Sequence, residues 1–197
     1  MSRLIMRYLI PVMLLASGAS IVYILFSAAS NLDGQAPFQR YAKGSLEKLD
    51  FTFAGTVPER TPFTGPEDQP LSLDRFKGQI ILVNFWATWC APCEREMPSL
   101  GALQTALGGD AFQIIAVSVD DDEDRAYART QLSRWTGGTL DFYHTSEYAL
   151  TYAVGIRGFP TTILYGADGA EIARFAGELD WSSLEAVGFI RAVIEAG

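Results

Sequence analysis

Two long apolar runs with a helical pattern between them dominate this chain. Residues 80–86 (IILVNFW) and residues 112–119 (FQIIAVSV) are almost continuously apolar, which is typical of strands that are covered on both faces. Between the runs, leucine and methionine recur at helical spacing up to a pair of glycines, which predicts a helix over residues 92–107. A helix that joins two long strands predicts a right-handed parallel crossover.

The second half of the chain adds further helices and a hairpin. The expected elements are helices over residues 122–135 and 146–154, strands over residues 161–165 and 171–175, and a last helix that is capped by Asp180 and runs to Glu195. The turn Ala167-Asp168-Gly169 between the two strands indicates an antiparallel hairpin. The predicted fold class is therefore α/β, with one mixed sheet and helices on both of its faces.

The segment before the first apolar run has weaker signals. We expect a short strand over residues 51–53 (FTF), a loop over residues 54–70, which are rich in Pro, Gly and Thr, and a turn of helix over residues 71–78. Residues 31–50 have the composition of a tether. The predicted organisation is a folded domain over residues 51–197 that follows this tether.

Residues 1–30 form a separate apolar segment. No residue from Tyr8 to Ala29 is charged, and this run is long enough for the roughly 20 residues that cross a bilayer as a helix. Arg3 and Arg7 precede the run, which predicts a cytoplasmic N-terminus and a domain outside the membrane. The alternative is a cleaved signal peptide, whose apolar region is usually shorter. We expect a single-pass anchor in the inner membrane and a domain that lies in the periplasm if the source is bacterial.

Charge and cysteine count argue against two classes of function, nucleic-acid binding and a structural zinc site. The chain of 197 residues has a formal net charge of −8, which makes it a poor binder of nucleic acid, because attraction to phosphate requires clustered Lys and Arg. Two cysteines and the single histidine, His144, fall short of the four ligands of a structural zinc site. The acidic run over residues 120–124 (DDDED) is interpreted as a solvated face of the domain.

Both cysteines lie in one C-x-x-C motif that follows the first apolar run. Cys90 would lie where the strand ends and the helix begins, and the free amides and dipole of a helix N-terminus lower the pKa of a thiol. On this interpretation Cys90 attacks, and Cys93 resolves the mixed disulfide. Half of a metal site and two buried thiols are alternatives. A purely structural disulfide is disfavoured, because closing so short a loop adds little stability.

Residues 80–98 (IILVNFWATWCAPCEREMP) closely resemble the active-site segment of the thioredoxin superfamily. The resemblance is strongest to its membrane-anchored TlpA-like branch of thiol-disulfide oxidoreductases, which includes ResA-like and CcmG-like proteins, and it extends from about Leu71 to the C-terminus. Residues 158–162 (GFPTT) look like the cis-proline loop of this family. The resemblance implies that the peptide bond between Phe159 and Pro160 is cis and lies against the cysteines. This loop and Trp89 would then contact an extended client segment.

The neighbours of the cysteines depart from those of an ordinary thioredoxin. Where thioredoxins carry a buried aspartate in the central strand, this chain has Asn84, which cannot accept a proton. Glu96 matches an acidic position that TlpA- and ResA-like proteins use near the cysteine pair. Since positions i and i+3 share a helix face, Glu96 can lie near Cys93 and take its proton. The alternative is an exposed glutamate that interacts only with the helix dipole.

The resemblance implies an exported reductase of disulfides in client proteins. Its clients would be apocytochromes awaiting haem attachment, copper-delivery proteins or copper-site subunits of cytochrome oxidase. A membrane thiol reductant would supply the electrons, and no cofactor is expected besides the redox-active Cys90–Cys93 disulfide.

Three other functions remain open at this stage. The motif also permits an oxidant or isomerase, because potentials in this superfamily range from roughly −270 to −120 mV. A copper chaperone would use Cys90, Cys93 and His144, since soft thiolates suit Cu(I). A peroxiredoxin is disfavoured, because its Thr-x-x-Cys motif would need the threonine three residues before Cys90, and Thr88 lies only two before it.

Overall fold

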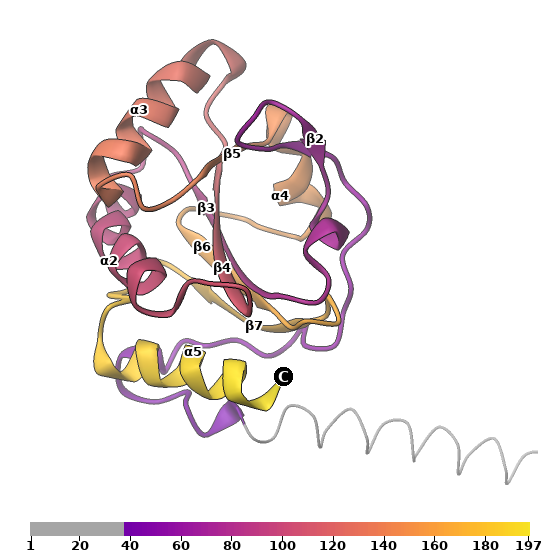
Figure 1. The fold of residues 1–197 in the computed structure, drawn as a ribbon, viewed down its shortest axis with the longest axis vertical. Helices are drawn as coiled ribbons and strands as arrows, with labels where there is room; N and C mark the ends of the chain where they lie inside the picture. Colours follow the sequence, from indigo (N-terminus) through magenta and orange to yellow (C-terminus); the bar gives the residue numbers. More distant parts are fainter. Residues whose placement is uncertain (1–37) are drawn as a thin grey trace, which may run out of the picture. The chain divides into compact units, whose positions relative to one another are not determined.

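The computed structural model describes residues 38–197, which build a hydrophobic core around a central sheet (Figure 1). The predicted anchor over residues 1–30 and the first part of the predicted tether lie outside the described residues. Within residues 38–197, no helix is both long and apolar enough to cross a membrane.

A mixed sheet of seven strands forms the centre of the domain. Its strands are β1 (Phe63–Thr64), β2 (Pro70–Leu71), β3 (Ile80–Trp86), β4 (Phe112–Ser118), β5 (Phe142–His144), β6 (Thr161–Tyr165) and β7 (Glu171–Ala176), in the order β2-β1-β5-β4-β3-β6-β7. Strand β3 pairs in parallel with β4 and antiparallel with β6, which itself pairs antiparallel with β7. The predicted crossover, hairpin and mixed sheet are confirmed.

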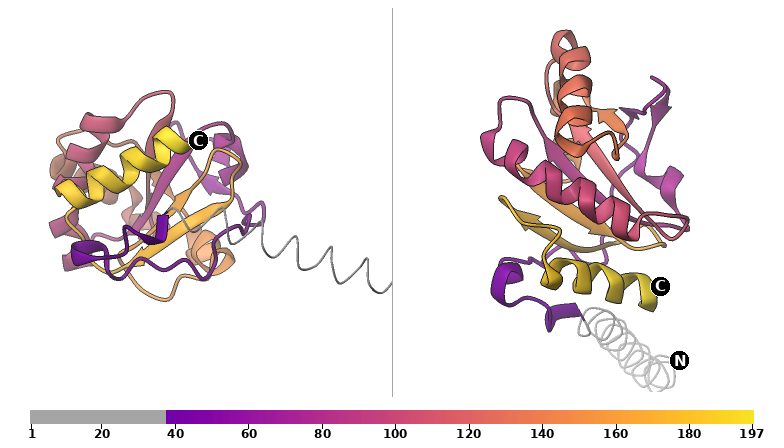
Figure 2. Two further views of the ribbon diagram at one scale, coloured as in Figure 1. Left: turned by 90° about the horizontal axis from the view of Figure 1, so that it is seen from below. Right: turned by 60° about the vertical axis from the view of Figure 1, so that its left-hand side comes forward.

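Helices cover both faces of this sheet (Figures 1 and 2). The α-helices are α2 (Ala91–Leu107), α3 (Arg125–Thr136), α4 (Ala149–Ala153) and α5 (Leu184–Ala196), and the 3-10 helices are η1 (Gly44–Leu46), η2 (Leu73–Phe76), η3 (Asp122–Asp124) and η4 (Ser146–Tyr148). Residues of α2, α3 and α5 pack into one core cluster, whereas α4 and η2 contribute to a second cluster on the other face. Every residue of β3 is buried, as expected for a strand that has a core on each side.

The N-terminal boundary of the domain lies earlier than predicted. Leu46 and Leu49 are buried in the core, and the rings of Phe38 and Tyr41 lie 6.4 and 5.6 Å from the ring of Phe189 on α5. Residues 38–50 are therefore part of the folded unit and not a free tether. Apolar side chains recur in this segment at helical spacing, at positions 38, 41, 42, 46 and 49, so the sequence does carry a sign of this packing, which the prediction of a tether from composition missed.

Two local predictions were wrong. Residues 51–53 do not form a strand: Asp50 forms an isolated bridge with Arg174 of β7, and the chain then turns. The last helix is capped by Ser183, whose hydroxyl accepts a hydrogen bond from the amide of Ala186. Asp180 instead accepts hydrogen bonds from the amide and hydroxyl of Ser182, which makes it part of a turn before the helix.

Candidate functional site

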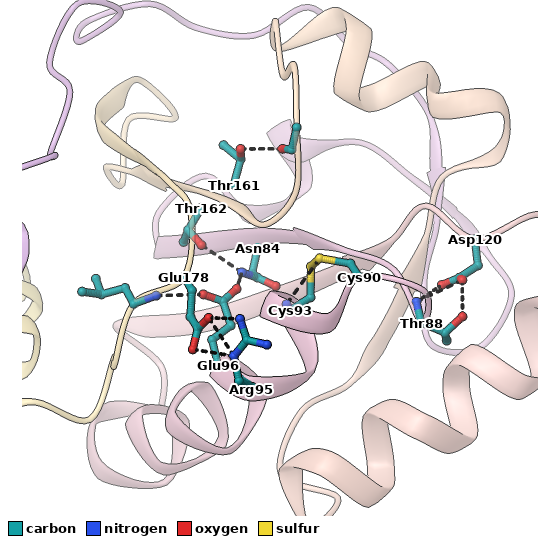
Figure 3. The surroundings of a disulfide bond; sticks show 12 residues. Asn84, Thr88, Cys90, Cys93, Arg95, Glu96, Asp120, Thr161, Thr162 and Glu178 are labelled. Carbon is teal, nitrogen blue, oxygen red and sulfur yellow. Dashed lines mark hydrogen bonds and ion pairs between the residues drawn. A yellow bond between two sulfur atoms is a disulfide. The ribbon is translucent and has the colours of Figure 1, made fainter.

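A disulfide between Cys90 and Cys93 lies at the N-terminus of α2 (Figure 3). Cys90 is the N-cap residue, with extended backbone angles, and its Sγ accepts a hydrogen bond of 3.3 Å from the amide of Cys93. Pro92 lies in the first turn, where its missing N–H has no helical partner to lose. Cys90 is 6% exposed and Cys93 is fully buried, so an incoming thiol or disulfide reaches Cys90 first.

Asp120 holds the loop that leads from β3 to Cys90. Its carboxylate accepts hydrogen bonds from the Thr88 amide at 3.0 Å, from the Thr88 hydroxyl at 2.5 Å and from the Ser118 hydroxyl at 2.8 Å. His144 supports this arrangement, because its Nε2 lies 2.7 Å from the Asp120 carbonyl oxygen. The prediction of a solvated acidic face is wrong for Asp120, which is 2% exposed.

Glu96 lies one turn after Cys93 and is almost fully buried, with 1% of its surface exposed. The Asn84 side chain donates a hydrogen bond of 2.7 Å to Glu96 Oε1 and another of 2.9 Å to Thr162 Oγ1, and the Leu179 amide donates to Glu96 Oε2 at 3.3 Å. Burial raises the pKa of Glu96 to about 8, although the Asn84 and Leu179 hydrogen bonds favour the charged form. The alternative of an exposed glutamate at this position is therefore excluded.

Asn84 suits a neighbour that gains and loses a proton. Its Nδ2 donates to Glu96, and its buried Oδ1 has no partner among the described residues. An amide carries both a donor and an acceptor, so it can pair with a carboxylate through Nδ2 and with a carboxylic acid through Oδ1. An aspartate at this position would add a second negative charge beside Glu96.

The cis-proline loop lies beside the cysteine loop. The peptide bond between Phe159 and Pro160 is cis, which confirms the prediction. The ring of Phe159 meets the ring of Trp89, the residue before Cys90, edge to face at 5.8 Å, and it stacks on Tyr148 at 6.2 Å. Tyr148 in turn lies 6.2 Å from Tyr152. The structure therefore joins Trp89 and Phe159, which the sequence proposed as contacts for a client, into a row of four aromatic rings.

An open cleft of about 1230 Å³ continues from this row of rings. Its walls include Tyr152, Arg157, Phe159 and Pro160, together with Phe53 from the N-terminal segment. Tyr152 and Trp89 are 73% and 62% exposed, although both are large apolar side chains. Exposed aromatic groups of this kind around a reactive disulfide are typical of a surface that contacts a protein.

Some of these residues were not identified from the sequence. Tyr148 and Glu147 have left-handed backbone conformations, with φ of 57° and 50°, which are uncommon outside glycine and turn Tyr148 toward the cis-proline loop.

Among residues 38–197, no three His, Cys, Asp or Glu side chains lie close enough together to hold a metal ion. The three-ligand copper site that would use Cys90, Cys93 and His144 is therefore not assembled.

Comparison with known proteins agrees with this geometry. The model of the Redoxin family matches residues 50–187. The chain belongs to the redoxin family. The thiol-disulfide oxidoreductase ResA of Bacillus thuringiensis subsp. konkukian (strain 97-27) is 32% identical to it over 154 residues, which cover 78% of this chain and 87% of that protein.

Solved structures share the thioredoxin-like fold. The thioredoxin domain of a thiol-disulfide oxidoreductase from Bacteroides vulgatus has a TM-score of 0.58 and 23% identity, and covers 72% of this chain and 97% of its own. A secreted disulfide oxidoreductase of Mycobacterium tuberculosis has a TM-score of 0.56 and 19% identity, and covers 68% of this chain and 96% of its own. The family match, the ResA relatives and the disulfide at the start of α2 identify this redoxin as a thiol-disulfide oxidoreductase.

Proposed function

We propose that this redoxin reduces disulfides in exported client proteins. The observation that carries the proposal is the sparse hydrogen bonding of Cys90 Sγ in the disulfide form. Among the described residues, the amide of Cys93 is the only hydrogen-bond donor found for Cys90 Sγ, at 3.3 Å, so a thiolate there would depend mainly on the N-terminus of α2 for its stabilisation. Strong oxidants of this superfamily owe their high potential to a stabilised reduced form. A site that stabilises its thiolate less has a lower potential, which suits a reductant.

In the proposed cycle, Cys90 attacks, Cys93 resolves the mixed disulfide, and Glu96 exchanges a proton with Cys93. The Cys90 thiolate attacks a client disulfide, and one client thiolate leaves. Cys93 then gives its proton to Glu96 and attacks Cys90, which releases the second client thiolate and forms the disulfide. Two electrons pass to the client, and its two thiolates take up two protons from water.

Glu96 acts in the opposite sense when the protein is reduced again. With a pKa of about 8 in the disulfide form, Glu96 keeps its proton at neutral pH. An upstream thiolate attacks Cys90, and Cys93 leaves as a thiolate that receives the proton of Glu96. Asn84 remains hydrogen-bonded to Glu96 in both protonation states, so the buried carboxyl group keeps a partner throughout the cycle.

We further propose that clients dock on the aromatic row formed by Trp89, Phe159, Tyr148 and Tyr152. The row leads from the disulfide into the open cleft, so a cysteine-containing segment of a client can place its sulfur on Cys90 while its neighbours contact the rings. Apocytochromes and copper-site proteins of cytochrome oxidase remain the proposed clients, on the strength of the resemblance to ResA-like proteins.

The proposed location is the periplasmic side of the inner membrane, with a membrane thiol reductant as the electron donor. Two observations support an exported domain: the uncharged run from Tyr8 to Ala29, which follows two arginines, and the likeness to an oxidoreductase that is described as secreted. The apolar run is proposed as an uncleaved anchor, which would keep the domain close to a donor in the same membrane.

The reduction potential of the cysteine pair tests the direction of the reaction. We expect a value nearer to roughly −270 mV than to roughly −120 mV when the protein is equilibrated with glutathione or dithiothreitol buffers. A value near roughly −120 mV would identify an oxidant and refute the proposal. In the cell, Cys93→Ala should accumulate mixed disulfides on Cys90 that identify the clients, and Cys90→Ser should accumulate none.

A further inference from the structure

A second cleft, smaller than the first, reaches Glu96 from another side of α2. It has a volume of about 300 Å³ and lies between α2 and the segment that follows β7. Its lining consists of Arg95, Glu96, Pro98, Ser99, Glu178, Leu179, Asp180 and Ser182. None of these residues lines the cleft beside the cis-proline loop. Glu96 therefore borders a second open cleft that shares no lining residue with the cleft beside the aromatic row.

An ion pair lies in the wall of this cleft. Arg95 Nη2 lies 2.6 Å from Glu178 Oε2, and Arg95 Nε lies 3.1 and 3.0 Å from the two carboxylate oxygens of Glu178, so the contact is bidentate. In Figure 3, Asn84 and the disulfide lie on one side of the Glu96 carboxyl group, and the pair lies on the other. Arg95 directly precedes Glu96 on α2, and Glu178 directly precedes Leu179, whose amide donates to Glu96.

The groups that face Glu96 can be named for every element packed against it. Strand β3 contributes Asn84, which also bonds Thr162 of β6, and the segment after β7 contributes the amide of Leu179 and the side chain of Trp181; all of these groups are neutral. The charges come from the cleft side, where Arg95 opposes Glu178 and a second carboxylate, Asp180, is turned toward Ser182. Burial is the main cause of the raised pKa of Glu96, and the negative charge of Glu178 adds to it. The charged groups near Glu96 thus lie on the side of the smaller cleft and not on the side of the disulfide.

We propose that the proton of Glu96 enters and leaves through this smaller cleft, and that Arg95 and Glu178 act as positioning residues that set how tightly it is held. This inference rests on the role of Glu96 in the proposed function. In the disulfide form Glu96 exchanges its proton with water, and this exchange decides whether Glu96 is protonated when an upstream thiolate attacks Cys90. The smaller cleft gives this exchange a path that does not pass the disulfide.

Single and double substitutions that remove the charges of Arg95 and Glu178 test whether the ion pair sets the pKa of Glu96. Glu178→Gln removes a negative charge and should lower the pKa of Glu96, whereas Arg95→Gln should raise it, each by about half a unit for partly screened charges a few ångströms away. The double variant should return close to the wild-type value, because the pair is neutral in both. The full-length chain is used, and the carboxyl band in infrared spectra, assigned with Glu96→Gln, gives the pKa.

The rate of disulfide reduction provides a second measure of the pKa of Glu96 in the same variants. The rate at which dithiothreitol opens the Cys90–Cys93 disulfide, corrected for the thiolate fraction of the reagent, should fall as Glu96 loses its proton. The pH at the midpoint of this fall should be lower in Glu178→Gln and higher in Arg95→Gln than in the wild type. The control Asp68→Asn breaks the ion pairs with Arg125 and Arg129 at the other edge of the sheet, and should leave the midpoint unchanged. Shifts of one sign in both single variants, or no shifts, would overturn the proposal.

A blocked active site tests the route. In the Cys93→Ala variant, Cys90 is linked through a disulfide to a peptide that contains one cysteine. We expect Glu96 to titrate with the pH of the buffer in this adduct, and Glu178→Gln to lower its pKa as in the free protein. Loss of the titration in the adduct would show that the proton passes Cys90 instead. Neither readout requires a natural client, so failure of the proposed reductase function would leave these results interpretable.

Discussion

Replacement of Glu96 by glutamine should change how the stability of the disulfide form depends on pH. In the unfolded chain a glutamate has a pKa of about 4.5, and burial raises that of Glu96 to about 8. Between these values the folded protein holds a proton that the unfolded chain has lost, so the free energy of unfolding falls as the pH rises. Glutamine cannot ionise, and the variant lacks this contribution.

The size of the effect follows from the distance between the two pKa values. Each pH unit between them is worth about 1.4 kcal/mol, so above pH 8 the buried carboxylate costs the wild type about 5 kcal/mol relative to its stability below pH 4.5. Glu96 is 1% exposed, so solvent screens little of this cost. Glutamine also places an amide donor near the Leu179 N–H, which adds a penalty that does not vary with pH.

Guanidinium unfolding of residues 38–197 measures this difference, because these residues contain the whole described core. The free energy of unfolding is compared for wild type and Glu96→Gln from pH 5 to 9, with the disulfide intact. We expect the free energy of unfolding of the variant, relative to that of the wild type, to rise by several kcal/mol from pH 5 to 9, with most of the rise below pH 8. In the control Glu147→Gln, which changes an exposed glutamate, the free energy of unfolding should depend on pH as it does in the wild type. If Glu96→Gln also showed the pH dependence of the wild type, the buried carboxyl group would not be protonated as argued.

Four further substitutions test local features of the structure. Asp120→Asn removes hydrogen bonds that hold the active-site loop and should lower the free energy of unfolding by about 2 kcal/mol in denaturant titrations. Gly101→Ala places a Cβ 2.9 Å from the Thr136 carbonyl oxygen and should cost about 1–3 kcal/mol. Gly188→Ala, in open space on α5, should instead stabilise by about 1 kcal/mol. Glu147 has a φ of 50°, which glycine adopts without the steric cost of a side chain, so Glu147→Gly should raise the melting temperature. An unchanged melting temperature would argue against backbone strain at this position.

The central strands and the catalytic motif could be predicted from the sequence, because their signals are local. The bounds of β3 and β6 agree with the apolar runs, and α2 begins one residue before its predicted start. The short strands β1 and β2 lie inside the predicted loop over residues 54–70. Each has only two residues and exists because β1 pairs with β5, a partner that no local pattern reveals.

The polar contacts of the site depend on tertiary distances that the sequence does not contain. Helical spacing placed Glu96 on the same face as Cys93, but the hydrogen bond from Asn84 also requires α2 to pack closely on β3. The same limit explains the error at Asp120, which begins a run of acidic residues that are otherwise exposed. Its burial results from the Thr88 loop folding over it, 32 residues away along the chain.

Residues 50–56 also cover the β7 edge of the sheet. The backbone groups of Arg174 that face away from β6 pair with Asp50, and those of Glu171 pair with Gly55 and Thr56. The opposite edge is β2, which has only two residues and begins with a proline. For a protein with the proposed clients, unpaired strand edges would be a risk, because they recruit incompletely folded chains into aggregates. Here both edges are protected, so the sheet offers such chains little backbone with which to pair.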